Sequence, residues 1–175
     1  VKLAAPDAIE FASGMAPITG LTGQTEHIKY LGGTETDLFM VYPATANTIS
    51  KMAMGIDDTA VTSFATVALG SNIPVLLAPA MHDSMFRNPA VSSNLARLVG
   101  MGVHVIGPHR EDGVRAKVAS KAEMVAWAIR CLSRDDLVGR RILVVGGRSE
   151  EPLDSMSLIT NRSTGLMSLV LAQRA

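Results

Sequence analysis

Short, continuously apolar runs recur along this chain, and they limit the folds that it can adopt. They are Leu38–Tyr42, Pro74–Ala78 and Val103–Gly107, and a further run follows at Arg141–Val145. Apolar and polar residues do not alternate within them, which is typical of strands whose two faces are both covered. We therefore expect each run to form a buried strand.

Helical patterns fill the gaps between the runs. Residues 48–55 and 59–70 lie in the first gap, and residues 88–99 lie in the second. Further along, Ser120 and Glu123 have the spacing of a capping box at the start of another helix. Strands that alternate with helices indicate right-handed βαβ units and a parallel sheet.

Ligand sites of such sheets lie beyond the carboxyl ends of the strands. The segments at those ends are 43–48 and 79–82. In the first, small residues and hydrogen-bonding side chains alternate: Ala44, Thr45, Ala46, Asn47 and Thr48. The start of a helix adds a partial positive charge. The pattern is that of a site for an anion or an electron-rich ring, and an ordinary helix cap is the alternative.

The composition excludes several other classes of function. Lys plus Arg and Asp plus Glu number 16 each, and aromatic residues make up 4%. We therefore expect neither nucleic acid nor a membrane surface as a partner. The longest apolar stretch, Ile73–Met81, is shorter than the ~20 residues that span a bilayer. A single cysteine, without Cys-x-x-Cys or His-Glu-x-x-His spacing, predicts a cytoplasmic protein with no metal site.

Further motifs carry a resemblance to a known family. The segment Pro43–Thr48 reads Pro-Ala-Thr-Ala-Asn-Thr, a His-Ile pair begins at His27, and Pro79–Met85 reads Pro-Ala-Met-His-Asp-Ser-Met. With these motifs the chain resembles the flavin-dependent cysteine decarboxylases. The likeness is greatest to the two-domain phosphopantothenoylcysteine decarboxylase/synthetases of archaeal type. It implies a flavodoxin-like, three-layer α/β/α domain over residues 1–134.

The resemblance also implies an activity and a cofactor. The activity is FMN-dependent decarboxylation of 4'-phosphopantothenoylcysteine to 4'-phosphopantetheine, a step of coenzyme A biosynthesis. His27 would then be the catalytic base, residues 44–48 would contact FMN, and Ala80, Met81 and His82 would bind the substrate. The family assembles as homo-oligomers, trimers or multiples of trimers, in which subunits share active sites.

Some positions depart from the family or keep another interpretation. His27 could be a surface histidine at a loop–helix junction. His82 stands where the family has an asparagine. It can donate a hydrogen bond to the substrate carboxylate, with added positive charge when protonated, or it fills space beside Met81. Many relatives carry a cysteine in the segment equivalent to 111–119, which has none here. Cys131 lies in an apolar helix, and we expect it in the core.

The last part of the chain resembles the opening of the family's synthetase domain. Gly146–Asp154 and Thr160–Met167 match two of its motifs, with Leu166 in place of a lysine. We expect a linker at 135–140 and, at 141–175, either the beginning of a second, Rossmann-like domain or a tail docked on the first.

In the family that second half joins cysteine to 4'-phosphopantothenate with CTP and Mg²⁺, and Asn161 matches one of its residues. Most of that domain has no counterpart in this sequence, nor do the first strand and phosphate loop of the decarboxylase. We therefore expect a fragment without ligase activity of its own. The alternatives are a non-catalytic, flavin-binding regulatory subunit of the same fold, a peptidyl-cysteine decarboxylase and a flavin prenyltransferase.

Overall fold

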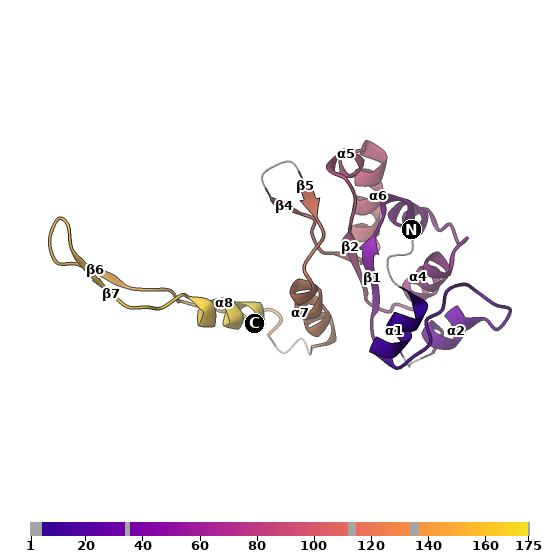
Figure 1. Cartoon of the computed structure of the whole chain (residues 1–175), viewed down its shortest axis with the longest axis horizontal. Coiled ribbons are helices and arrows are strands. Elements are labelled where there is room, and N and C mark those ends of the chain that lie inside the picture. Colours follow the sequence, from indigo (N-terminus) through magenta and orange to yellow (C-terminus); the bar gives the residue numbers. More distant parts are fainter. Residues whose placement is uncertain (1–4, 34–35, 112–114, 134–136, 175) are drawn as a thin grey trace. The chain divides into compact units, whose positions relative to one another are not determined.

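The computed structural model describes residues 5–33, 36–111, 115–133 and 137–174. The chain divides into two compact units, Val1–Leu132 and Ser133–Ala175, and each is described by itself (Figure 1). Within the described ranges, no helix has both the length and the apolar character needed to cross a membrane.

A parallel sheet of three strands forms the centre of the first unit. The strands, in their order across the sheet, are β1 (Phe39–Ala44), β2 (Val75–Pro79) and β3 (His104–Val105). The register pairs Val41 with Leu77 and Leu77 with Val105. The three runs predicted as strands in this unit are confirmed, and so is their parallel arrangement.

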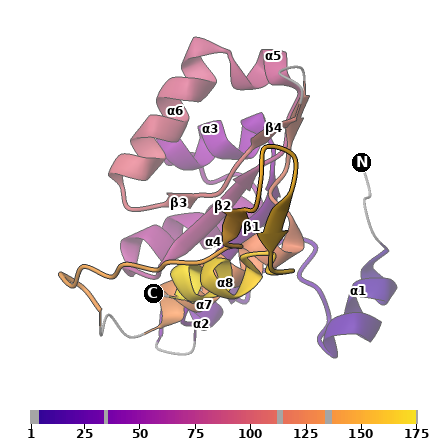
Figure 2. The ribbon, with the colours of Figure 1, turned by 90° about the vertical axis from the view of Figure 1, so that its left-hand side faces the viewer.

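Helices cover one face of this sheet with a large apolar core. They are α3 (Ala46–Met54), α4 (Ala60–Gly70) and α6 (Pro89–Gly100), and α3 packs beside α6 (Figure 2). Val41, Val75 and Leu77 enter this core from the strands. The buried residues that the three helices contribute are Ala46, Ile49, Met52, Ala53, Ala65, Ala68, Val91, Leu95 and Leu98.

The opposite face carries a smaller core under α7 (Lys121–Leu132), which contacts β2. Leu76 and Ala78 of β2 enter this core. The other buried members are Ile106, Ala119 and Met124. Neighbouring residues of β2 thus point into different cores, as the two-residue repeat of a strand requires. The sheet lies between two helical layers, and the predicted α/β/α architecture is confirmed.

Two predicted helix starts have the caps that the sequence indicates. Asn88 accepts a hydrogen bond from the backbone N–H of Ala90 at 2.9 Å, and Pro89 is the first residue of α6. Before α7, the backbone N–H of Ser120 donates to Glu123 Oε2 at 2.8 Å, and the N–H of Glu123 donates to Ser120 Oγ at 3.2 Å. These bonds satisfy N–H groups that a helix start leaves unpaired.

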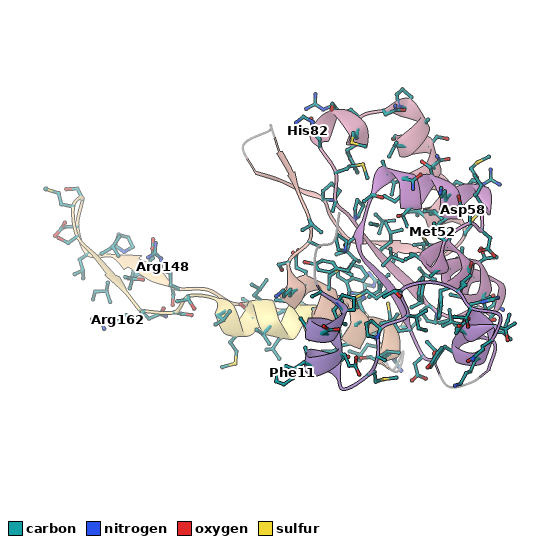
Figure 3. The ribbon with its side chains drawn as sticks, turned by 45° about the vertical axis from the view of Figure 1, so that its right-hand side comes forward. Phe11, Met52, Asp58, His82, Arg148 and Arg162 are labelled. Carbon is teal, nitrogen blue, oxygen red and sulfur yellow. The ribbon has the colours of Figure 1, made fainter. Side chains whose placement is uncertain are left out.

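Shorter elements complete the first unit. They are α1 (Pro6–Ser13), α2 (Glu26–Leu31), α5 (Asp83–Phe86) and the antiparallel pair β4 (His109–Glu111) and β5 (Arg115–Lys117). α2 packs against α4, whereas α5 packs against α6 and β5. α1 has no buried residue, and its Phe11 is 93% exposed (Figure 3).

The second unit contains an antiparallel hairpin and a helix, namely β6 (Glu150–Pro152), β7 (Leu158–Thr160) and α8 (Leu166–Arg174). The strand predicted at 141–145 is wrong, because these residues have no regular structure. A strand forms only when neighbouring strands pair with its N–H and C=O groups. The described residues of this unit provide no such neighbour, and Leu143 and Val145 are 87% and 84% exposed.

One close contact organises the start of α8. A Cβ atom added at Gly146 would lie 1.9 Å from Ser168 Oγ. Glycine is therefore required for the Gly146-Gly147 turn to lie against this helix. The apolar stretch that begins at Leu166 forms this helix. The assignment of 141–175 to a Rossmann-like domain stays a prediction.

The central strand offers a direct test of the two cores. Leu76 and Leu77 are both 0% exposed and belong to different cores. Replacing either with alanine should lower the free energy of unfolding by about 2–5 kcal/mol, since each change removes buried methyl groups and leaves a cavity. Urea unfolding measures the effect. Val99→Ala, at a position 56% exposed on α6, is the control and should change stability by less than ~0.5 kcal/mol.

Candidate active site

The carboxyl ends of β1 and β2 bring the two predicted loops together. The backbone N–H of Ala80 donates to the carbonyl oxygen of Ala44 at 2.8 Å. Between Val41 and Ala44 the register shifts, so that β1 contains a bulge at Pro43. Proline has no N–H to donate, and a bulge is a place where a strand tolerates it. Bulges next to active sites also redirect the chain, and here the chain turns into α3.

The start of α3 presents the side chains expected at a binding site. Thr45 is the N-cap: its Oγ1 accepts from the backbone N–H of Thr48 at 3.3 Å and lies 3.2 Å from Thr48 Oγ1. Ala44 and Ala46 are buried, and Asn47 is exposed. The N–H groups of a first helical turn have no partner within the helix. Small residues, free N–H groups and a positive helix end therefore meet here and can accept an anion or a polar ring edge.

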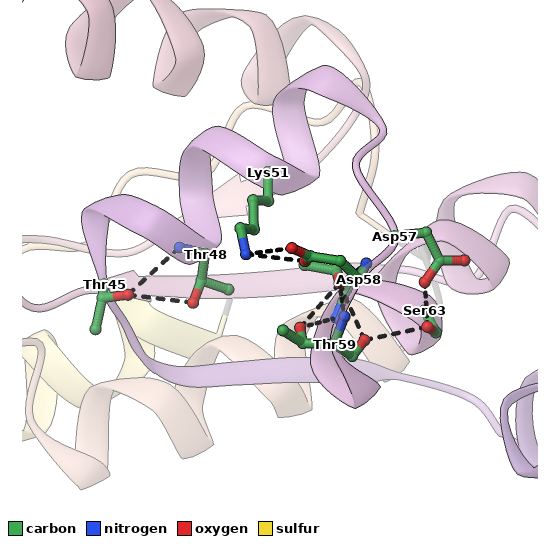
Figure 4. A network of polar contacts seen from close by, with 8 residues as sticks. Thr45, Thr48, Lys51, Asp57, Asp58, Thr59 and Ser63 are labelled. Carbon is green, nitrogen blue, oxygen red and sulfur yellow. Dashed lines mark hydrogen bonds and ion pairs between the residues drawn. The ribbon is translucent and has the colours of Figure 1, made fainter. Parts of the chain in front are cut away.

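A polar network ties the other end of α3 to α4 (Figure 4). Lys51 Nζ lies 2.7 and 2.9 Å from the two carboxylate oxygens of Asp58. Thr59 and Thr62 form a capping box at the start of α4. Ser63 also donates a hydrogen bond to Asp57. The helix that carries the 44–48 segment is thus held at its far end as well as by its core residues.

The loop after β2 begins with half-buried Ala80 and Met81 and continues into α5. Met81 packs against the larger core. His82 is exposed and is the N-cap of α5, with Nδ1 accepting from the backbone N–H of Ser84 at 3.3 Å (Figure 3). Asp83 is neither a partner of this imidazole nor a solvated charge: it is buried, and its carboxylate lies 2.6 Å from Arg87 Nε.

His27 lies at the start of α2, in an unusual local environment. Its Nδ1 is buried without a hydrogen-bond partner among the described residues. Thr25, the N-cap, has a φ of 53°, a left-handed conformation that is costly for a β-branched residue. A hydrogen bond from the Thr22 hydroxyl lowers the pKa of Glu26, which keeps a carboxylate beside the imidazole. An unpaired buried nitrogen and a strained cap are features of functional sites rather than of plain surface histidines.

The structure joins some of the predicted residues and leaves others apart. Residues 44–48 and 80–82 lie at one edge of the sheet. Among the described residues, no hydrogen bond or ion pair connects His27 to either loop. Asn161 belongs to the second unit, where its Nδ2 lies 3.2 Å from Ser149 Oγ and its Oδ1 accepts from the backbone N–H of Ser163 at 3.0 Å.

Sequence reasoning missed one contact beside the site. Tyr42 Oη donates to the carbonyl oxygen of Ala119 at 3.1 Å. This bond connects the strand before the bulge to the chain between β5 and α7. It joins residues 77 positions apart, and no local pattern in the sequence could have indicated it.

The described side chains do not suit a metal ion as well as they suit an organic cofactor. In those parts of the chain, no three His, Cys, Asp or Glu residues are placed so that they could share a metal ion. The site instead has a cap hydroxyl, an exposed amide and a helix start. Those are donors for a phosphate or for the polar edge of a ring.

Comparison with known proteins places this geometry in a family. The family profile described as Flavoprotein matches residues 1–133. The coenzyme A biosynthesis bifunctional protein CoaBC of Thermococcus kodakarensis is 45% identical over 176 residues, which cover 99% of this chain and 43% of that protein. Its counterpart from Methanocaldococcus jannaschii is 34% identical over 174 residues, or 98% of this chain and 42% of that protein. The chain thus spans about two-fifths of these relatives.

Solved structures share the fold of the first unit. The FMN-dependent cysteine decarboxylase SpaF has a TM-score of 0.60 and 29% identity, over 75% of this chain and 74% of that chain. A PPC decarboxylase variant complexed with pantothenoylaminoethenethiol has a TM-score of 0.53 and 26% identity, over 59% of this chain and 58% of that chain. These likenesses confirm the flavodoxin-like fold.

The position of Cys131 predicts that its thiol reacts slowly and does not replace the cysteine that many relatives carry in the segment equivalent to 111–119. Its side chain is half-buried in α7 and packs against the smaller core, and burial raises the pKa of its thiol. The thiolate is the reactive form, so Cys131 should react with a thiol reagent at pH 7.5 several times more slowly than a free cysteine. Absorbance of the released reporter measures this rate. Reaction as fast as in the urea-unfolded protein would contradict the buried position.

Proposed function

The chain belongs to the Flavoprotein family, and on that premise we propose that its first unit binds FMN and catalyses the decarboxylation of 4'-phosphopantothenoylcysteine. The product would be 4'-phosphopantetheine, on the way to coenzyme A. The observation that carries this proposal is the 2.8 Å bond between Ala80 and Ala44, because it holds the expected cofactor segment beside the expected substrate segment.

Similarity supports the choice of cofactor and substrate. The relative from Thermococcus kodakarensis is named for coenzyme A biosynthesis. SpaF is described as FMN-dependent, and the PPC decarboxylase structure contains a pantothenoyl enethiol. Two of the three are thus named as decarboxylases, and the third is named for coenzyme A biosynthesis. A shared fold alone would not specify this reaction.

The residues of the α3 start fit a flavin. Thr45, Asn47 and Thr48 would offer hydrogen bonds to polar atoms of FMN, while Ala44 and Ala46 leave room for close approach of the ring. When bound, FMN would supply a reversible acceptor for a hydride from the cysteinyl Cβ, once the thiol has lost its proton. That chemistry makes loss of CO₂ easy and leaves no net oxidation.

Two histidines would act on the substrate. His27 would take the thiol proton, for which a histidine is suited near neutral pH. Nδ1 of His27 has no hydrogen-bond partner among the described residues, so no other group of the fold is seen to occupy it. His82 would bind the substrate carboxylate in place of the family asparagine, next to Ala80 and Met81.

The remaining predictions concern the whole protein. We propose that it assembles as a homo-oligomer, a trimer or a multiple of one, in which His27 meets the 79–85 loop of another subunit. We also propose that ligation of cysteine to 4'-phosphopantothenate, with CTP and Mg²⁺, belongs to the second half of the protein, where Asn161 would take part.

The first test is the flavin itself. Protein expressed from the complete coding sequence should purify yellow, and the cofactor released by denaturation should be FMN rather than FAD. Chromatography of the released cofactor distinguishes the two. A colourless protein that gains no colour on incubation with FMN would contradict both the proposed cofactor and the reaction that depends on it.

The second test concerns the base. His27→Asn should keep bound FMN but reduce CO₂ release by about 10²–10⁴-fold, the usual contribution of a positioned base. His104→Asn is the matched control. That exposed histidine lies tilted against Trp127, with 6.0 Å between the ring centroids, and its replacement should leave the rate unchanged. Near-normal activity of His27→Asn would return His27 to a surface role. No CO₂ release from a yellow wild-type protein would favour the non-catalytic, flavin-binding alternative.

A further inference from the structure

The structure determines which ring nitrogen of His82 is available to a ligand. Within the described residues, both hydrogen bonds of the ring use Nδ1: the backbone N–H of Ser84 at 3.3 Å and the Ser84 hydroxyl at 2.9 Å. A backbone N–H can only donate, so Nδ1 must offer a lone pair and carry no proton. In the neutral ring the proton then sits on Nε2. Because His82 is exposed, this Nε2–H is free to meet a ligand.

We propose that His82 holds the substrate carboxylate through Nε2–H as a neutral imidazole, and that Ser84 is the positioning residue that selects this tautomer. The inference rests on the proposed decarboxylase function. An asparagine can perform the same two tasks, since Oδ1 caps the helix and Nδ2 donates. At position 82, therefore, the family asparagine and this histidine can both cap the helix and donate a hydrogen bond.

This arrangement sets the direction of the pH dependence. Histidines change charge between about pH 5 and pH 8. Protonation puts a hydrogen on Nδ1, where it faces the N–H of Ser84, and the cap bond is lost. The backbone N–H of Ser84 then has no acceptor on the ring, and only the Ser84 hydroxyl, which can accept from Nδ1–H, still contacts the imidazole. Substrate binding therefore weakens as the pH falls, although an imidazolium attracts a carboxylate more strongly than a neutral ring does.

Charged groups lie on α5 itself and on the elements beside it. On α5 itself, the Asp83 carboxylate is already paired with Arg87 at 2.6 Å. α6 and β5 are the elements that pack against α5. The charged residue of α6 is a cation, Arg97.

The tautomer can be observed without any activity. In protein from the complete coding sequence, with ¹⁵N-labelled histidine, the His82 signals are those lost in His82→Asn. We expect an unprotonated Nδ1 and a protonated Nε2 in the neutral state. Binding is measured with 4'-phosphopantothenoylserine, which keeps the substrate carboxylate but has a hydroxyl in place of the oxidisable thiol.

The variants separate the cap from the donor. Wild-type affinity should fall as the pH is lowered from about 8 to 5, and His104→Asn should show the same fall. His82→Asn should bind as tightly as the wild type at pH 8 and lack the fall. His82→Asp keeps a capping oxygen but has no donor, and it should bind about 10- to 100-fold more weakly.

Two results would overturn the inference in an active, FMN-containing enzyme. One is a neutral His82 protonated on Nδ1. The other is wild-type binding that tightens toward acidic pH while that of His82→Asn does not. A protein with neither FMN nor CO₂ release would instead overturn the proposed function, and the carboxylate role of His82 with it.

Discussion

The hydrogen bond from Ala80 to Ala44 continues the pairing of β1 and β2 beyond the last residues of the sheet, and the candidate site depends on it. The bond keeps its position because β2 cannot move. Every residue of β2 is buried, and alternate side chains enter different cores. A shift of one residue would exchange Leu76 with Leu77 and disturb both cores at once. The cores therefore fix the strand ends, and the strand ends fix the spacing of the two loops.

Several polar groups of the candidate site already make hydrogen bonds or ion pairs within the chain. The side chains of Thr45 and His82 each accept a hydrogen bond from a backbone N–H at the start of a helix. Lys51 is occupied by Asp58, and Asp83 by Arg87. These contacts fix the backbone around the candidate site. They involve the N–H of Thr48 and Nδ1 of His82, and they do not involve the N–H groups of Ala46 and Asn47 or Nε2 of His82.

Much of the first unit could be predicted because its signals are local. Continuous apolar runs indicate strands that are covered on both faces, and Asn88 and Ser120 identify helix starts by their side-chain chemistry. The run at 141–145 has the same composition but forms no strand, because pairing depends on neighbours that composition does not reveal. The roles assigned to His27, His82 and the 44–48 segment came from resemblance to a family. The polarity of the residues alone left an ordinary helix cap as an equal alternative.

Contacts between distant or differently oriented groups could not be predicted. The Lys51–Asp58 pair joins α3 to the loop before α4, and Tyr42 reaches Ala119. The tautomer of His82 follows from the direction of the Ser84 backbone N–H. That direction depends on α5 beginning directly after His82, which the sequence does not show. Each of these depends on a backbone path rather than on residue type.

The bulge in β1 also changes the phase of the strand. Val41 and Ala44 are three residues apart, yet both are buried in the larger core, whereas in a regular strand residues at that spacing point to opposite faces. The extra residue at Tyr42-Pro43 reverses the alternation of side chains, so that Ala44 faces the same core as Val41 where the chain enters α3. A chain one residue shorter at this point could pair just as well along β2. It would turn the start of α3 away from the loop after β2, so the length of β1 shapes the candidate site even where its side chains do not line it.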